Sequence, residues 1–509
     1  MSQQLARAKL TWFGFVVFVS SAIVMVLEIT AGRLLAPFVG VSLYTWTSII
    51  GVVLAGLSVG SWLGGRWADA GAGEKHIGIV LSTAAVLTLA SLGLLTLIAP
   101  GLQGAELSLI SSSFIYMCVL FLLPAMLLGI VTPLLTTMSL KLDSRAGHIV
   151  GRMHALAALG SIIGTFITGY WLVQYFGTRN IVAICAAVLL VLGLPFFRPP
   201  RQGAYIGVLM AVLLVSGVTA IRDGFSNPCN KESNYFCIRV DAYNEDLPFG
   251  EAKAMILDHL LHGVNHKQEP GMFISPYVHL MDELVLGFFG GDRAQTLNYF
   301  FAGGGAYTQP RGVAYFAPDA KVTVAELDPY VTQLAQENLY LDTNGMNVIH
   351  KDARLVLQET TELFDVVVSD VYHDIAIPYH LVTNEYHQLV KERLAPDGLY
   401  VTNIVDIFPD PRFLKSMIKT LSASFKYVQV WLESIPETSA RVTYVVSASN
   451  AMPIPEVVQA QRGFSRAWLD ISEPLYTTGT SMKEVPVLTD DFAPVDRLLS
   501  GLLLTEAGK

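Results

Sequence analysis

Charged residues, cysteines and metal-ligand patterns are all scarce in this 509-residue sequence. Only 15% of the residues are charged, no long run of like charge occurs, and the net charge is −9. This balance argues against a nucleic-acid partner, because nucleic acid attracts basic surfaces. The histidine spacings match no zinc signature, which predicts a protein without a bound metal. No cleavable signal peptide is evident, since the first apolar segment is too long for an h-region.

Hydrophobic residues make up 52% of the chain, and nearly all of this excess lies before residue 222. A helix needs about 20 apolar residues to cross the hydrocarbon core of a bilayer. Seven segments qualify, which predicts an N-terminal all-α membrane bundle over residues 1–222 with the lipid bilayer as its partner. The segments are roughly 11–31, 44–64, 77–99, 108–131, 153–175, 180–197 and 203–221.

Lysine and arginine are distributed unevenly between the loops on the two sides of this bundle. Arg33 and Arg179 lie on one side. The other side holds Arg7, Lys9, Arg66, Lys75, Lys141, Arg145, Arg152, Arg198 and Arg201. Because basic loops stay in the cytoplasm, the N-terminus is predicted to be cytoplasmic. With an odd number of spans, the C-terminal domain is then extracytoplasmic, in a multi-pass protein of the bacterial inner membrane.

Two pairs of features near the spans leave alternatives open. Cys229 and Cys237 flank "NKESNYF" and form either a disulfide, as an oxidising compartment allows, or two free thiols. Glu28 and Arg33 are ionisable groups near membrane depth, where such groups are costly and commonly functional. They could instead pair structurally or reach the interface.

Four glycines recur at four- or five-residue spacing in the second apolar segment. They are Gly51, Gly56, Gly60 and Gly64. Such a row of small residues allows two helix backbones to approach closely. We therefore interpret the row as a helix-packing surface.

The pattern changes after the last apolar segment. Residues 223–285 are predicted to form a linker and a small β-rich lid that includes "YFCIRVDAY" and "KAMILDHLL". Apolar strands then alternate with amphipathic helices over residues 286–509. This alternation predicts an α/β fold with a mainly parallel, doubly wound sheet. In such sheets, ligands bind beyond the carboxyl ends of the strands.

Four predicted strands end in residues suited to a nucleoside site. "FFAGGG" brings bare backbone at Gly303, Gly304 and Gly305 to a helix N-terminus. A carboxylate at Glu326, about 20 residues further on, suits ribose hydroxyls. Asp352 with Ala353 follows the third strand and suits an adenine edge, and Asp370 follows "FDVVVS", where it could accept a proton. Each aspartate could instead cap a helix.

The motifs together resemble the polyamine aminopropyltransferases, the spermidine synthase family. The segments that show the resemblance are "GGG", "VAELDP", "KDA", "FDVVVSD", "IPYHLVTNEYHQLVKERLAPDGLYVTN" and "LTDDFAPVD". "LEITAGRLLAPFVG" is typical of the branch in which this domain is fused to a membrane bundle. The resemblance covers nearly the whole chain and implies a Rossmann-like, methyltransferase-type fold.

The resemblance also implies a reaction. The cosubstrate is decarboxylated S-adenosylmethionine, and an amine attacks the carbon beside its sulfonium to give methylthioadenosine and a polyamine. Asp370 matches the family's catalytic aspartate, and Glu326 matches its ribose ligand. Asp352 and Ala353 match its adenine contact, and Tyr277 falls near the tyrosine of its substrate loop.

The chain departs from the family pattern around the amine. Ala306 replaces an aspartate that contacts the aminopropyl end of the ligand, and His262 and Asn403 replace glutamines. The acidic "DEF" stretch is absent, and Asp374 is displaced by one residue from the family's second aspartate. Substitutes for the lost acids are Glu269, Asp282 or Glu283. The substrate-binding candidates are His262, Tyr277, His279, Tyr372 and Asn403.

Several functions therefore stay open at this point. The simplest is aminopropyl transfer to a small-molecule amine other than putrescine, in a protein that could form a homodimer. Alternatives are a transporter or assembly factor with a non-catalytic nucleoside-binding outer domain, and another reaction of S-adenosylmethionine, either methyl transfer or sulfonium lysis. His373 and His380 could tune the proton affinity of Asp370.

Overall fold

A computed structural model describes residues 3–105, 107–197, 202–243, 250–372 and 377–504 of the chain. The chain divides into two compact units, Met1–Pro228 and Cys229–Lys509. The second unit contains both the predicted lid and the predicted Rossmann-like domain. The boundary placed after residue 285 therefore stays a prediction.

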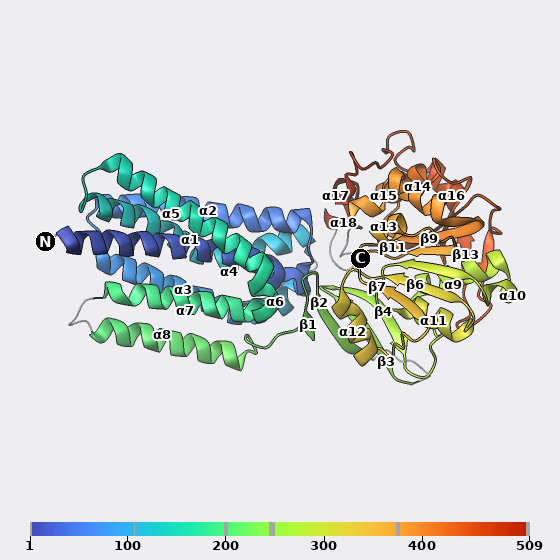
Figure 1. The fold of residues 1–509 in the computed structure, drawn as a ribbon, viewed down its shortest axis with the longest axis horizontal. Coiled ribbons are helices and arrows are strands. Elements are labelled where there is room, and N and C mark those ends of the chain that lie inside the picture. Colours follow the sequence, from blue (N-terminus) through green and yellow to red (C-terminus); the bar gives the residue numbers. More distant parts are fainter. Residues whose placement is uncertain (1–2, 106, 198–201, 244–249, 373–376, 505–509) are drawn as a thin grey trace. The chain divides into compact units, whose positions relative to one another are not determined.

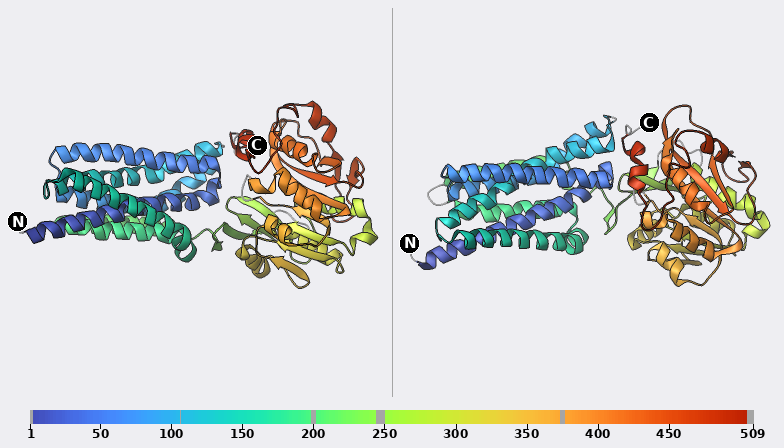
Figure 2. Two further views of the ribbon diagram at one scale, coloured as in Figure 1. Left: turned by 45° about the horizontal axis from the view of Figure 1, so that its top comes forward. Right: turned by 90° about the horizontal axis from the view of Figure 1, so that it is seen from above.

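The first unit is a bundle of long helices that run side by side (Figures 1 and 2). Six helices in the described part of the chain are long and apolar enough to cross a membrane. The seventh predicted span forms the 20-residue helix α8, whose apolar part, Ile206–Ile221, is shorter than the six candidate spans. The elements are α1 Gln3–Val39, α2 Leu43–Asp69, α3 Glu74–Gln103, α4 Leu109–Leu140, α5 Ala146–Ile167, η1 Thr168–Leu172, α6 Val173–Phe176, α7 Thr178–Gly193, η2 Leu194–Phe196 and α8 Gln202–Ile221.

The glycine row of α2 packs against α4. A Cβ atom added at Gly56 would stand 2.9 Å from the Leu122 carbonyl oxygen, and one at Gly64 would stand 2.8 Å from that of Ile130. Gly60 is closer still, since its added Cβ would collide with the Met126 carbonyl oxygen, so the predicted packing surface is confirmed at these three positions. Gly51 has nothing within 4 Å of its added Cβ, and its inclusion in the surface was wrong.

The second unit begins with a four-stranded antiparallel sheet in the order β1-β2-β3-β4. A disulfide joins Cys229 to Cys237, the first residue of β2, which resolves the alternative left open for these cysteines. The strands are β1 Lys231–Glu232, β2 Cys237–Tyr243, β3 Ala252–Leu257 and β4 Leu260–His266.

A nine-stranded mixed sheet forms the centre of the second unit, in the order β12-β13-β10-β11-β9-β8-β5-β6-β7. The five strands from β9 to β7 are parallel to one another, as predicted, whereas β10 to β13 pair antiparallel. The strands are β5 Asn298–Ala302, β6 Lys321–Ala325, β7 Met346–Ile349, β8 Phe364–Ser369, β9 Leu394–Phe408, β10 Tyr427–Leu432, β11 Ala440–Ser449, β12 Val457–Gln459 and β13 Ala467–Asp470.

Helices cover both faces of this sheet (Figure 2). Tyr299, Phe300 and Phe301 are consecutive in β5 and all buried, although neighbouring side chains of a strand point to opposite faces. Such a strand is stable only between two covering layers, so the α/β fold class is confirmed. The helices are α9 Pro276–Phe289, α10 Gly291–Ala294, α11 Thr308–Phe316, α12 Pro329–Asn338, α13 Ala353–Glu359, η3 Tyr379–Leu381, α14 Asn384–Arg393, α15 Arg412–Leu421, α16 Ser472–Thr477, α17 Val495–Leu498 and α18 Ser500–Leu504.

Candidate active site

The strand order places a topological switch point between β5 and β8. From β5 the chain continues to β6 and β7 on one side, and then returns to β8 and β9 on the other. The connections that leave the carboxyl ends of β5 and β8 therefore diverge and leave a crevice between them. The glycine turn follows β5, and Asp370 follows β8.

The glycine turn requires its glycines for two separate reasons. Gly303 and Gly305 have φ values of +87° and +51°, a region that other residues rarely adopt. A Cβ atom at Gly303 would collide with the Asp370 carbonyl oxygen, and one at Gly304 would stand 2.6 Å from the ring of Tyr307. The backbone of the turn therefore lies bare against the crevice and close to the end of β8.

Glu326 directly follows β6 and closes the turn from the other side. Its Oε2 atom accepts a hydrogen bond of 2.8 Å from the Gly304 N–H, and its Oε1 atom accepts one of 2.8 Å from the Asp328 N–H. Burial raises the pKa of the Glu326 carboxyl to about 7, against the opposing effect of these bonds. A buried carboxylate of this kind can still accept hydroxyl donors on its remaining lone pairs.

Asp352 acts both as a helix cap and as part of the crevice wall. Its Oδ1 atom accepts hydrogen bonds from the N–H groups of Arg354 and Leu355, which begins α13. Its Oδ2 atom lies 2.8 Å from Nε2 of His380. Burial raises the pKa of Asp352, but the His380 hydrogen bond and the backbone bonds outweigh it and leave the pKa below its usual value.

Asp370 is held at both oxygens by neutral donors. Asn403 Nδ2 donates to Oδ1 at 3.0 Å, and the Tyr277 hydroxyl donates to Oδ2 at 3.2 Å. Burial raises the pKa of the Asp370 carboxyl, and these two hydrogen bonds oppose the rise. The hydroxyl of Tyr372 accepts a short hydrogen bond from the Val405 N–H of the neighbouring strand. The carboxylate therefore has a fixed orientation and an increased affinity for a proton.

These groups share one cavity, which encloses about 660 Å³ free of protein atoms, part of it open to solvent. Apolar side chains, among them Phe236, Leu257 and Leu381, complete its wall. Three other predicted residues bind lining residues by hydrogen bonds: Gly304 binds Glu326, and Tyr277 and Asn403 bind Asp370. The predicted residues that line the cavity directly are His262, Gly303, Gly305, Glu326, Asp352, Ala353, Asp370 and Tyr372.

His279 lies elsewhere. It is buried, with Nε2 2.8 Å from the Arg462 carbonyl oxygen and 3.4 Å from Glu283. Asp282 binds the Arg462 guanidinium at 2.5 Å. His279, Asp282 and Glu283 of α9 thus cluster around Arg462, which lies between β12 and β13, and none of the three lines the cavity. Glu269 lines a different pocket beside Phe316, so it does not replace the lost acids either.

His380 contacts Asp352 rather than Asp370, contrary to the expectation that it tunes Asp370. His373 and Asp374 lie outside the described residues. Ala306 is buried beside the turn, where a Cβ atom added at Gly263 would come within 2.7 Å of it. The Ala306 side chain therefore packs against the bare backbone of Gly263.

Two supports of the cavity were not predicted from the sequence. Arg354 forms a bidentate ion pair of 2.6 and 2.7 Å with Asp490 and also donates to the His380 carbonyl oxygen at 3.0 Å. Asp490 in turn accepts from Thr383, the residue that caps α14. The motif "LTDDF" contains Asp490, but the residue that pairs with it, Arg354, stands more than a hundred residues earlier in the chain.

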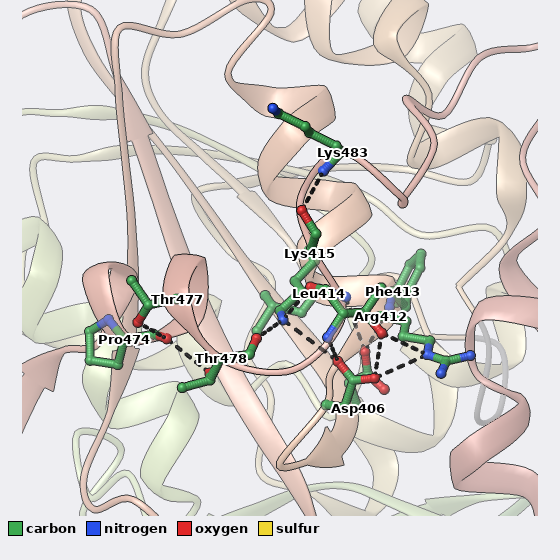
Figure 3. A network of polar contacts seen from close by, with 12 residues as sticks. Asp406, Arg412, Phe413, Leu414, Lys415, Pro474, Thr477, Thr478 and Lys483 are labelled. Atoms are coloured by element: carbon green, nitrogen blue, oxygen red, sulfur yellow. Dashed lines mark hydrogen bonds and ion pairs between the residues drawn. The ribbon is translucent and has the colours of Figure 1, made fainter.

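A second support is a network of polar contacts around Asp406 and Lys415 (Figure 3). Asp406 lies in β9, the strand that also contains Asn403. Asp406 Oδ2 accepts hydrogen bonds of 2.9 and 3.0 Å from the N–H groups of Phe413 and Leu414, in the first turn of α15. The buried Lys415 ammonium donates to the carbonyl oxygens of Thr478 and Thr480. Strand β9 is thereby joined to α15, and α15 to a later loop.

No metal site accompanies this cavity in the part of the chain that the structure describes. No group of three or more His, Cys, Asp or Glu side chains there is placed to hold an ion. The expectation of a metal-free protein stays a prediction.

Comparison with known proteins relates this unit to one family. Residues 285–458 match the family model described as "Spermine/spermidine synthase domain". A probable polyamine aminopropyl transferase of Bifidobacterium longum is 26% identical over 232 residues, which cover 40% of this chain and 50% of that protein. Polyamine aminopropyltransferase 1 of Streptomyces coelicolor is 24% identical over 443 residues, covering 80% of this chain and 78% of that protein.

The matched lengths differ among the relatives. The chain spans about half of two of them, 50% of the Bifidobacterium longum protein and 49% of Thermospermine synthase ACAULIS5 of Arabidopsis thaliana. Among solved structures, a probable spermidine synthase from Corynebacterium glutamicum is 21% identical, with a TM-score of 0.44. That alignment covers 52% of this chain and 97% of the other. All of the residues that the family model matches lie in the C-terminal unit.

Proposed function

We propose that the C-terminal unit transfers an aminopropyl group from decarboxylated S-adenosylmethionine to a small-molecule amine, releasing methylthioadenosine and a longer polyamine. One observation carries the proposal. Glu326, Asp352 and Asp370 follow three different strands, yet line one cavity beside the bare backbone of the glycine turn. This arrangement, in a region that matches the spermine/spermidine synthase model, supports the binding of a nucleoside next to a proton acceptor.

The nucleoside part of the cosubstrate would be held by three elements. The carboxylate of Glu326 accepts hydrogen bonds from the ribose hydroxyls, since its two oxygens offer about four lone-pair sites, more than the backbone N–H groups of Gly304, Gly305 and Asp328 use. Asp352 and Ala353 flank the adenine edge. The glycine turn lets the ligand approach the backbone without a side chain between them.

The proton is handled by Asp370. The cosubstrate supplies an electrophilic carbon beside its sulfonium, and only a neutral amine can attack it. The new N–C bond forms as the C–S bond breaks, and the excess proton on nitrogen passes to the Asp370 carboxylate. Tyr277 and Asn403 hold both oxygens of Asp370 in place, and His262 and Tyr372 lie on the amine side as substrate contacts.

A second candidate is favoured by the disulfide between Cys229 and Cys237. Disulfides persist in oxidising compartments, so this bond supports an extracytoplasmic C-terminal unit. With a cytoplasmic N-terminus, this placement requires α8 to cross the membrane as a seventh span, in addition to the six long apolar helices. Nucleoside cosubstrates are made inside the cell. In this candidate, the unit binds a nucleoside without turnover and serves a transporter or assembly factor. The six apolar helices are consistent with a multi-pass membrane protein, and we place it in a bacterial inner membrane.

Purified full-length protein in detergent separates the two candidates. It is incubated with decarboxylated S-adenosylmethionine and a panel of amines, and methylthioadenosine is quantified by mass spectrometry. Enzymatic transfer predicts amine-dependent product that falls about 100- to 10,000-fold in Asp370→Asn. Binding of methylthioadenosine without any turnover of the cosubstrate, unaffected by Asp370→Asn, would establish the second candidate. Product without an added amine would indicate a lyase, and methylated amine formed from S-adenosylmethionine a methyltransferase.

A further inference from the structure

The wall of the cavity includes two residues of the small antiparallel sheet, Phe236 and Leu257. Phe236 directly precedes β2, and Leu257 is the last residue of β3. Phe236 is buried, so most of its ring packs against protein while the remainder reaches the cavity. An aromatic ring at this place offers a ligand a large and rigid apolar surface.

Cys237 lies between these two wall residues and is held from β3. The Cys237 N–H donates to Oδ1 of Asp258 at 2.9 Å, and the Asp258 N–H donates to the Cys237 carbonyl oxygen at 2.9 Å. Asp258 directly follows Leu257 and is fully buried. The start of β2 is therefore fixed to the end of β3.

Phe236 itself stands outside this pairing of β2 with β3. Both of its backbone groups bind Ser233 instead. The Phe236 N–H donates to the Ser233 hydroxyl oxygen at 2.9 Å, and the Ser233 N–H donates to the Phe236 carbonyl oxygen at 2.9 Å. Ser233 follows β1, whose two residues pair with Cys237 and Ile238. So short a pairing contributes little stability by itself.

The disulfide closes the segment that carries Ser233 and Phe236. It joins Cys229 to Cys237, so the chain between them forms a loop that is covalently fixed at both ends. Such a cross-link restricts the conformations that the enclosed residues can adopt. The position of the Phe236 ring therefore depends on this bond.

The loop also packs beside the strand end that carries Glu326. The Lys231 ammonium, within the loop, lies 4.3 Å from the centre of the Tyr330 ring. Tyr330 belongs to α12, which begins three residues after Glu326. The disulfide-closed loop thus borders the part of the cavity assigned to the ribose.

We propose that Phe236 contacts the bound nucleoside and that the Cys229–Cys237 disulfide positions it, so that nucleoside binding weakens when this bond is reduced. The inference rests on the nucleoside site of the proposed function. Reduction by a dithiol adds two electrons and two protons to the bond and gives two thiols, while the dithiol becomes a disulfide. The loop is then held by noncovalent contacts alone, and the ring loses its fixed place in the wall.

Equilibrium dialysis of radiolabelled methylthioadenosine against full-length protein in detergent tests both parts. Dithiothreitol is the reductant, and alkylation followed by mass spectrometry reports the state of each cysteine. Reduction should raise the Kd about tenfold, the scale of a lost apolar contact. Phe236→Ala should raise the Kd of the oxidised protein by about the same factor. Reduction should then have no further effect in this variant, because both changes remove one contact.

Two cysteine variants complete the design. Cys229→Ser combined with Cys237→Ser should reproduce the affinity of the reduced protein and no longer respond to dithiothreitol. The matched control replaces the free cysteines of the helical unit, Cys118 and Cys185, by alanine and should keep the full response.

The outcomes separate this inference from the proposed function. A Kd that reduction does not change would overturn the inference and leave the nucleoside site standing. So would a Kd that reduction raises as much in Phe236→Ala as in the unmodified protein. Absence of methylthioadenosine binding to the oxidised protein would overturn the nucleoside site and the inference together.

A reciprocal measurement needs no variant. If reduction weakens binding, the bound nucleoside must make the disulfide harder to reduce by the same factor. In thiol–disulfide redox buffers, saturating methylthioadenosine should shift the reduction potential of the Cys229–Cys237 pair by about 30 mV to more negative values, which corresponds to a tenfold change in affinity. A potential that the ligand does not move would contradict the proposal.

Discussion

Glu326 should make nucleoside binding depend on pH. We consider a change from pH 8 to pH 6. Methylthioadenosine is the ligand, because this molecule carries no group that titrates in this range. The pKa of Glu326 is raised to about 7 by burial, and ribose hydroxyls bind to its ionised form. About nine tenths of the carboxyl is ionised at pH 8 and about one tenth at pH 6.

The magnitude follows from these fractions. The apparent Kd should be roughly tenfold higher at pH 6 than at pH 8, equivalent to about 1.4 kcal/mol. The sign is fixed because the ligand favours the ionised acid, so binding must lower the pKa of Glu326 and release a proton. At pH 7 about half a proton should leave per ligand bound.

Isothermal titration calorimetry in buffers of different ionisation enthalpy measures both quantities on full-length protein. Glu326→Gln should bind weakly at every pH and lose the proton release. Asp370→Asn serves as the control, since it removes the other acid of raised pKa from the cavity and should keep the pH dependence. An affinity that does not change between pH 6 and pH 8 in the unmodified protein would refute the assigned role of Glu326.

Three further predictions concern the base, the turn and the topology. Asn403→Ala and Tyr277→Phe each remove a hydrogen bond that lowers the pKa of Asp370, so the acidic limb of the pH–rate profile should move to higher pH; an unmoved limb would contradict Asp370 as the base. Gly304→Ala places a Cβ 2.6 Å from the Tyr307 ring and should abolish methylthioadenosine binding in calorimetry while the protein still elutes as a monodisperse peak. A C-terminal alkaline phosphatase fusion should be active and a green fluorescent protein fusion dark; the reverse pattern would place the C-terminal unit in the cytoplasm.

Much of the cavity could be anticipated because parallel strands bring their carboxyl ends to one edge. Glu326 and Asp370 each follow a mostly buried apolar strand, and Asp352 follows the part-buried edge strand β7. The ends of these neighbouring parallel strands bring the three acids together. His380 could not be paired with Asp352 in the same way, since it comes from the connection between β8 and α14. The Arg354–Asp490 ion pair joins segments with no local signal between them.

The errors arose where side-chain direction mattered. His279 stands in a plausible stretch of the substrate loop, but the helical register of α9 turns it toward Arg462, while Tyr277, two residues earlier, reaches Asp370. Gly51 shares the spacing of the glycine row, yet lies beyond its contact with α4. The antiparallel strands β10 to β13 were not predicted, because no helix separates β10, β11, β12 and β13 from one another and the alternation of strands and helices ends at β10.

A structure of the full-length protein with bound methylthioadenosine tests the central claim most directly. The claim is that carboxylates from successive strand ends hold one nucleoside beside the proton acceptor. The account predicts ribose hydroxyls about 3 Å from the Glu326 carboxylate, the adenine edge beside Asp352 and Ala353, and the sulfur facing Asp370. A nucleoside bound away from these three carboxylates, or with its sulfur turned away from Asp370, would contradict it.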